Sequence, residues 1–178
     1  LEWQGLKIGR GSINGNYQPA LADTFNLEVD IADLALAGFE FDSALLAASG
    51  DAAALGASLR TQGDVEGLLE VSARAGAGGA WTGELAATSL QSRQGDWYLE
   101  LEGALAGQFA ATWAPGQTLA LDGDIQARDL RLTRHHGAGE SGSVAWQKIA
   151  ARVRNDAAGL FLDLGVYTAD SKVVGLDL

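Results

Sequence analysis

The chain offers few side chains that could carry out catalytic or metal chemistry. Its two histidines, His135 and His136, are adjacent, and neighbouring side chains of an extended chain diverge, so they cannot both face one metal ion. They open the polar stretch 135–143, which we expect to be the longest loop. The chain has no cysteine, so thiolate ligands and disulfides are excluded. We predict no catalytic histidine, no metal and no other cofactor.

Carboxylates are abundant, but their spacing is that of a solvated strand face. Glu100 and Glu102 are two residues apart, as are Asp122 and Asp124, so each pair shares one face of an extended strand. A calcium loop needs a denser series of oxygen ligands. The stretch GRGSING (9–15) lacks the Gly-Lys-Ser/Thr ending of a phosphate loop, and we expect a turn there. The sequence therefore predicts that the protein is not an enzyme.

Composition limits the remaining classes of function. The formal net charge is −11, with acidic residues spread along 178 residues, so a nucleic-acid partner is not expected and adsorption to an anionic membrane surface is disfavoured. A hydrophobic content of 47% is sufficient for a folded core. Because both ends fall within alternating patterns, we interpret residues 1–178 as a single β-sheet segment of a much larger, repetitive β protein.

The elements that position these residues are predicted to be strands. Apolar and polar residues alternate with period two in 25–31, 69–75, 97–102 and 119–127. Successive side chains of a strand point to opposite faces, so each stretch describes a strand with one apolar and one polar side. The pattern predicts an all-β protein of roughly 12–14 short strands that form an elongated, curled sheet.

Turn signals and one ambiguous segment divide the strands. AGAGGA (75–80) and WAPGQ (113–117) are predicted turns. The stretch 41–60 is rich in Ala and Leu, which favours a short helix, but Gly50 and Gly56 divide it. We expect strands there and keep the helix as the alternative.

The apolar phase slips at three points. After Ile31, Ala127 and Trp146, the apolar series resumes three positions later instead of two, at Leu34, Leu130 and Ile149 respectively. Such a slip would move later side chains to the other face unless a bulge or bend absorbs it. We therefore predict bulges or corners at these points.

The tryptophans mark a family resemblance. The chain has five, and their ordinary role is packing or covering a sheet edge: Trp3, Trp81, Trp97, Trp113 and Trp146. The stretch GGAWTGELAATSLQSRQGDWYLELEGAL (78–105) resembles the recurrent text of the TamB family, in which a Trp-x-Gly-x-Leu strand precedes a Gly-x-Trp-x-Leu strand. The resemblance extends from about residue 39 onward, and residues 1–38 agree only in style. A cysteine that the family often has after the second Trp strand is missing, so the subfamily stays open.

The resemblance implies a place and a function. TamB proteins and the related AsmA-like, bridge-type lipid carriers of Gram-negative bacteria are anchored in the inner membrane. They cross the periplasm towards an Omp85-type (TamA-like) outer-membrane partner. Their sheet curls into an open trough with an apolar lumen, called a β-taco. The family is linked to phospholipid transport between the membranes and to assembly of outer-membrane and autotransported proteins.

A trough of this kind predicts which side chains face phospholipid acyl chains. The expected groove lining is Phe25, Leu27, Val29, Leu69, Val71, Leu99, Leu101, Leu119, Leu121, Ile125, Leu160, Leu162 and Leu164. Glu100, Glu102, Asp122 and Asp124 would then face water. Two alternatives remain: a structural β-sandwich filled by its own side chains, and a chaperone-like trough that receives client strands by edge pairing. Free sheet edges would also allow edge-to-edge self-association.

Overall fold

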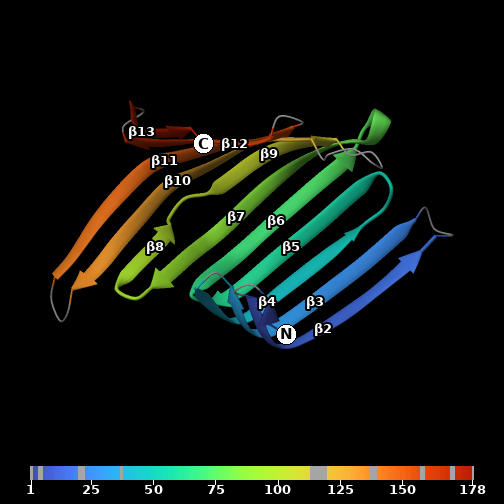
Figure 1. Ribbon diagram of the computed structural model, residues 1–178, viewed down its shortest axis with the longest axis horizontal. Coiled ribbons are helices and arrows are strands. Elements are labelled where there is room, and N and C mark those ends of the chain that lie inside the picture. The colour runs from blue at the N-terminus through green and yellow to red at the C-terminus, as the bar shows by residue number, and fades with distance from the viewer. Residues whose placement is uncertain are drawn as a thin grey trace.

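The described part of the chain forms one antiparallel sheet of thirteen strands (Figure 1). In this computed structural model, the described residues are 2–3, 6–19, 23–36, 38–112, 120–136, 140–156, 159–168 and 171–177. The strands are β1 (Glu2–Trp3), β2 (Leu6–Gln18), β3 (Thr24–Leu36), β4 (Phe39–Gly50), β5 (Ala54–Gly63), β6 (Val65–Ala75), β7 (Ala80–Gln94), β8 (Trp97–Leu101), β9 (Leu105–Thr112), β10 (Ala120–His136), β11 (Glu140–Asp156), β12 (Gly159–Thr168) and β13 (Ser171–Asp177). The predicted all-β class and number of strands are confirmed.

Strands follow one another in space almost as they do in sequence. Each strand from β1 to β8 pairs with the next, and β10 to β13 do the same. The exception is in the middle, where β8 and β9 lie end to end between β7 and β10 and each pairs with both. Most connections between consecutive strands are short, so the sheet extends strand by strand.

The Ala-rich stretch 41–60 is strand, as preferred over the helix. It forms most of β4 and β5, which are joined by a tight turn at Asp51. The Asp51 carboxylate accepts hydrogen bonds from the backbone N–H groups of Ala53 (2.7 Å) and Ala54 (2.8 Å). These bonds lower the pKa of Asp51. Pairing with neighbours on both sides of the hairpin outweighs the helical propensity of Ala and Leu.

Two predicted turns are wrong, one is correct and one lies outside the described residues. GRGSING (9–15) runs straight through β2, because every residue from Arg10 to Gln18 pairs with β3. The polar stretch 135–143 is mostly strand, since β10 continues to His136 and β11 begins at Glu140. AGAGGA (75–80) is the β6–β7 turn, with a short 3₁₀ segment at Ala77–Gly79. WAPGQ (113–117) falls in the undescribed range.

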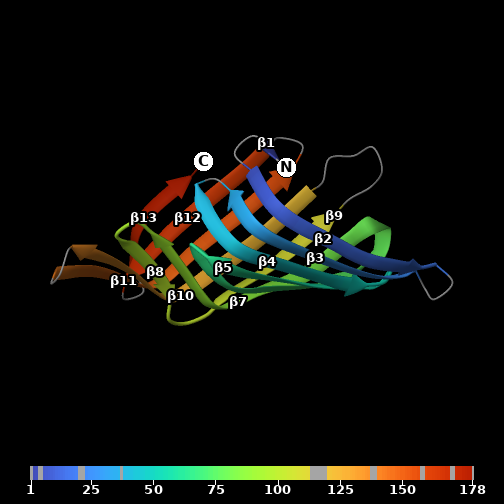
Figure 2. The same ribbon diagram turned by 90° about the horizontal axis from the view of Figure 1, so that it is seen from below.

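The sheet is curled into a trough. Figure 2 shows both edges of the sheet, β1–β3 and β11–β13, rising on the same side of the central strands β6–β8. All described strands belong to this one sheet, so they form no second layer of the kind that a sandwich requires. The predicted elongated, curled sheet is therefore the observed fold.

A line of bulges crosses the sheet and accounts for the phase slips. At each position of this line, the regular pairing of the strands is interrupted. The residue has a left-handed conformation, or the ladder skips a pair or shifts register, or one strand ends before the next begins. The positions are Gly9, Asp33, Asp42, Gly67, Ser89, Gly103, Asp129 and Gln147. Asp33, Ser89 and Asp129 have φ of 57°, 55° and 54°. All three predicted slips lie on this bulge line.

The bulge line keeps the apolar side chains on one face. A Cβ built on Gly11, which pairs with Ile31, would lie 4.0 Å from Cγ2 of Ile8, three residues away. Likewise, a Cβ on Gly67 would lie 3.1 Å from Cδ1 of Leu90. One extra residue per strand thus reverses the alternation without moving the apolar residues to the polar face. The same insertions allow the sheet to bend.

Candidate functional site: the apolar face

The apolar side chains of ten strands join into continuous rows on one face. Directly paired residues of antiparallel strands point to the same side, so the registers trace each row. One row is Ile13, Val29, Leu46, Leu59, Leu69, Ala87, Leu105, Ala127, Ile149 and Val166. The next is Gly15, Leu27, Ala48, Ala57, Val71, Leu85, Gly107, Ile125, Ala151 and Leu164. We call this side of the sheet the apolar face.

Ten of the predicted groove residues lie together on this face. They are Phe25, Leu27, Val29, Leu69, Val71, Leu101, Leu121, Ile125, Leu162 and Leu164, and all have half-buried or buried side chains. Leu99 also belongs there, beyond the bulge line, opposite Leu132. Leu160, in β12, is paired in register with Asn155 of β11. Leu119 lies outside the described residues.

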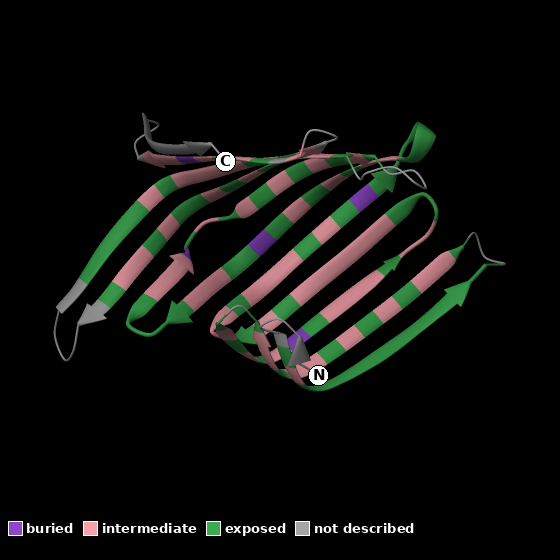
Figure 3. Cartoon of the chain, viewed as in Figure 1, coloured by how far each residue is buried: buried purple, intermediate pink, exposed green. Residues whose placement is uncertain are grey.

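The apolar face is the inner side of the curl. All the buried hydrophobic residues of the described chain lie on it, and the largest of these, Leu101, is only 4% exposed. A side chain in a one-layer sheet becomes this buried only where its neighbours converge, which is the concave side. Figure 3 shows half-buried and exposed positions alternating along nearly every central strand. The sequence also missed members of this face, above all Leu46, Leu59, Leu85, Leu105 and Phe109.

The opposite face is polar and carries the ion pairs. Arg131 lies 2.9 Å from Glu102, and Arg152 lies 3.0 Å from Asp122. The hydrogen bond from Arg152 lowers the pKa of Asp122 and raises that of Arg152. Glu102 and Asp122 therefore face solvent, as predicted.

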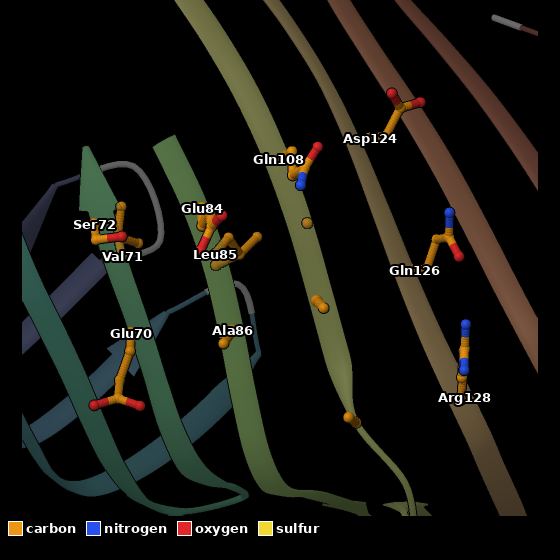
Figure 4. A pocket seen from close by; sticks show the side chains of 13 residues that line it. Glu70, Val71, Ser72, Glu84, Leu85, Ala86, Gln108, Asp124, Gln126 and Arg128 are labelled. Atoms are coloured by element: carbon orange, nitrogen blue, oxygen red, sulfur yellow. The ribbon is translucent and has the colours of Figure 1, made fainter. Parts of the chain in front are cut away.

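A wide hollow lies on this polar face (Figure 4). It measures about 930 Å³ and lies over β6, β7, β9 and β10, where Glu84, Gln108 and Asp124 are paired neighbours. Short side chains such as Ala86 and Ala106 form its floor. A strongly twisted sheet is saddle-shaped, so each face is concave along one diagonal. The hollow is thus a consequence of twist, and its walls are charged and open to water.

The described tryptophans occupy different environments. Trp81 and Trp146 are half-buried, opposite Ala111 and Leu130 respectively, which fits their expected packing role. Trp97 is 45% exposed at the start of β8, and the Arg134 guanidinium lies 5.1 Å from its ring centre. Burial, followed by the charges of Glu100 and Glu66, raises the pKa of the neighbouring Tyr98.

The described residues contain neither a cluster suited to a metal ion nor a helix suited to a bilayer. None of their His, Asp and Glu side chains gather in groups of three or more that could hold a metal ion. Among these same residues there is also no helix with the length and apolar character needed to cross a bilayer.

Comparison with known proteins identifies the family. The family model described as "TamB, N-terminal domain" matches residues 1–100, which include the stretch 1–38 that resembles the family only in style. No curated protein and no solved structure gives a match to this chain. The matched residues cover β1 to β7 and most of β8, so they include half of the trough. The chain belongs to the TamB family, whose members act in translocation, assembly and outer-membrane biogenesis in the bacterial envelope.

Proposed function

We propose that this chain is a segment of a larger, inner-membrane-anchored protein and conducts phospholipid acyl chains along its apolar face through the periplasm. In this proposal, the whole protein delivers lipid towards an Omp85-type, TamA-like partner in the outer membrane. The observation that carries the proposal is the continuity of the apolar rows across ten strands. No catalytic group is required for this function.

The energetics of acyl-chain burial support a sliding mechanism. Burying a methylene group contributes about 0.8 kcal/mol. Because the two rows traced above continue across ten strands with the same apolar character, a chain that moves from one strand to the next along them exchanges similar contacts. The barrier to movement is therefore small compared with the cost of returning the lipid to water. The polar face keeps the outside of the trough hydrated.

Photocrosslinking in cells tests the conduit. A benzoylphenylalanine placed at Leu69 or Leu85 of the whole protein would lie on the apolar face, and one at Glu70 or Ala86 would lie on the polar face of the same strands. We expect phospholipid adducts at Leu69 and Leu85 only. Equal labelling at all four positions, or none at Leu69 and Leu85 in folded protein, would contradict the proposal.

The edge of β2 supports a second candidate, a trough that receives client strands. β1 pairs only with Leu6 and Lys7, so no described strand pairs with the outer edge of β2 from Arg10 to Gln18. Ile13 and Tyr17 on this segment are 73% and 62% exposed. Such an edge can add a strand of an outer-membrane protein, of another segment of this protein or of a second copy.

Crosslinking at the β2 edge tests this candidate. A benzoylphenylalanine at Asn14 should label an outer-membrane or autotransported protein if client strands pair there. Asn26 on β3, which has paired strands on both sides, is the matched control. Adducts confined to the protein itself would assign the edge to continuation of the sheet or to self-association, and would rule out client pairing at β2.

A further inference from the structure

A single basic side chain marks one end of the apolar face. Trp97 and Arg134 are directly paired on β8 and β10, and the following pair on the same face is Leu99 with Leu132. Among the described side chains of the apolar face, Arg134 is the only Lys or Arg. The apolar surface therefore ends in a cation that lies within reach of a molecule bound along it.

Arg134 differs in its partners from the three arginines that form ion pairs with carboxylates. Arg10, Arg131 and Arg152 each have a carboxylate within 3.5 Å. Among the described residues, Arg134 has no such carboxylate, and its guanidinium instead lies over the indole of Trp97 at 5.1 Å from the ring centre. A stacked guanidinium keeps its in-plane N–H donors available, and their fork geometry suits two phosphate oxygens.

The surroundings are those of a boundary between apolar and aqueous phases. Trp97 is 45% exposed, and an indole combines a large apolar ring with one N–H donor. Beside it is a hollow of about 370 Å³ that is lined by Arg93, Gly95, Asp96, Trp97 and Tyr98. One direction along the face from this point leads to Leu101 and Leu130, and the other leads along β10 and β11 to the paired positions of His136 and Glu140.

We propose that Arg134 and Trp97 form a subsite for the phosphate group of a phospholipid whose acyl chains lie on Leu99, Leu101, Leu130 and Leu132. The proposal rests on the proposed function, because it gives a headgroup position to the lipid that the trough conducts. Arg134 binds the phosphate and Trp97 holds the guanidinium in place and covers the first acyl carbons. Phospholipid is thereby distinguished from an uncharged lipid with the same chains.

Calorimetric titration with three soluble probes tests this subsite. The probes are dihexanoyl phosphatidylglycerol, which has chains and phosphate; dihexanoylglycerol, which has chains only; and inorganic phosphate. For the unmodified chain we expect dihexanoyl phosphatidylglycerol to bind about tenfold more tightly than dihexanoylglycerol, the ratio expected from one charged hydrogen-bonding contact. Arg134→Gln should abolish this ratio and leave dihexanoylglycerol binding unchanged. The matched control Arg131→Gln, on the polar face of the same strand, should leave both affinities unchanged.

The outcomes separate the subsite from the conduit. If Arg134→Gln keeps the tenfold ratio while both lipids still bind, the subsite is wrong and the conduit stands. If neither lipid binds the unmodified chain, both fail. If inorganic phosphate alone binds as tightly as the phospholipid and depends on Arg134, the site is a free-phosphate site and the headgroup assignment is overturned. Arg134→Lys, which retains charge but loses the planar fork, should give an intermediate ratio.

Discussion

The phenyl ring of Phe109 lies over Gly83 of the neighbouring strand on the apolar face. A Cβ added at Gly83 would collide with Cζ of that ring and with the backbone carbonyl oxygen of Ser72. The ring thus occupies the space that a side chain at position 83 would need. Covering a strand glycine with an aromatic side chain also removes backbone from water.

This relationship predicts that Gly83→Ala destabilises the chain by about 1 to 3 kcal/mol, the usual cost of overpacking. Gly56→Ala on β5 is the matched control, because the nearest atom to its added Cβ, the Ser49 carbonyl oxygen, is 3.9 Å away. Urea unfolding measures both variants. Equal effects at the two positions would mean that contact with Phe109 and Ser72 does not limit position 83.

Leu101 should be the most sensitive leucine of the apolar face. It is 4% exposed, so Leu101→Ala leaves a cavity and should cost about 2 to 5 kcal/mol. Leu45, 38% exposed on the polar face, is the control, and its replacement by Ala should cost less than about 1 kcal/mol. Thermal unfolding compares the two. A smaller loss at Leu101 than at Leu45 would argue against the convergence of side chains inside the curl.

Asp129 should tolerate glycine better than a β-branched residue. Its φ of 54° is unfavourable for most side chains, and glycine adopts it freely. We expect Asp129→Gly to leave stability nearly unchanged and Asp129→Val to lose about 1 to 3 kcal/mol. Denaturant unfolding of the two variants measures the difference. Similar losses for both would show that the Asp129 carboxylate, and not its backbone conformation, matters on the bulge line.

Acid should weaken the contribution of Asp122. The Arg152 hydrogen bond lowers the pKa of Asp122 in the folded chain. A carboxyl group with a lowered folded pKa adds stability above its unfolded pKa of about 3.9, and this stability disappears as the pH falls through the folded pKa. The melting temperatures of Asp122→Asn and the unmodified chain should therefore differ at pH 7 and converge towards pH 2. A constant difference across this range would exclude the ionised pair as its source.

The alternation of residue types determines much of this fold. Period two predicted the strands, the two faces and most of the groove lining, because a strand places successive side chains on opposite sides whatever its neighbours are. The phase slips at Ile31, Ala127 and Trp146 predicted three crossings of the bulge line for the same reason. The slip at Ser89 was missed, because small residues around it give little contrast between the faces.

Cross-strand pairing decided the features that local patterns could not predict. LELEGAL (99–105) and LALDGDI (119–125) are similar in sequence. The first is interrupted at Gly103, between the end of β8 and the start of β9, whereas β10 continues through Gly123. The break lies against Asp129, whose carbonyl oxygen accepts a hydrogen bond from the Glu102 N–H at 2.9 Å. Only the assembled sheet places these residues together.

The sequence by itself thus determined that strands with one apolar side would form, and the tertiary structure decided what those sides create. GRGSING became strand because β3 offered a complete ladder of partners, which outweighs the turn preference of Asn-Gly. The pairing of Trp97 with Arg134, far apart in the chain, likewise follows from the register of β8 and β10. Local alternation fixes a side chain's face, whereas register and curvature, which depend on all neighbouring strands, fix what it meets there.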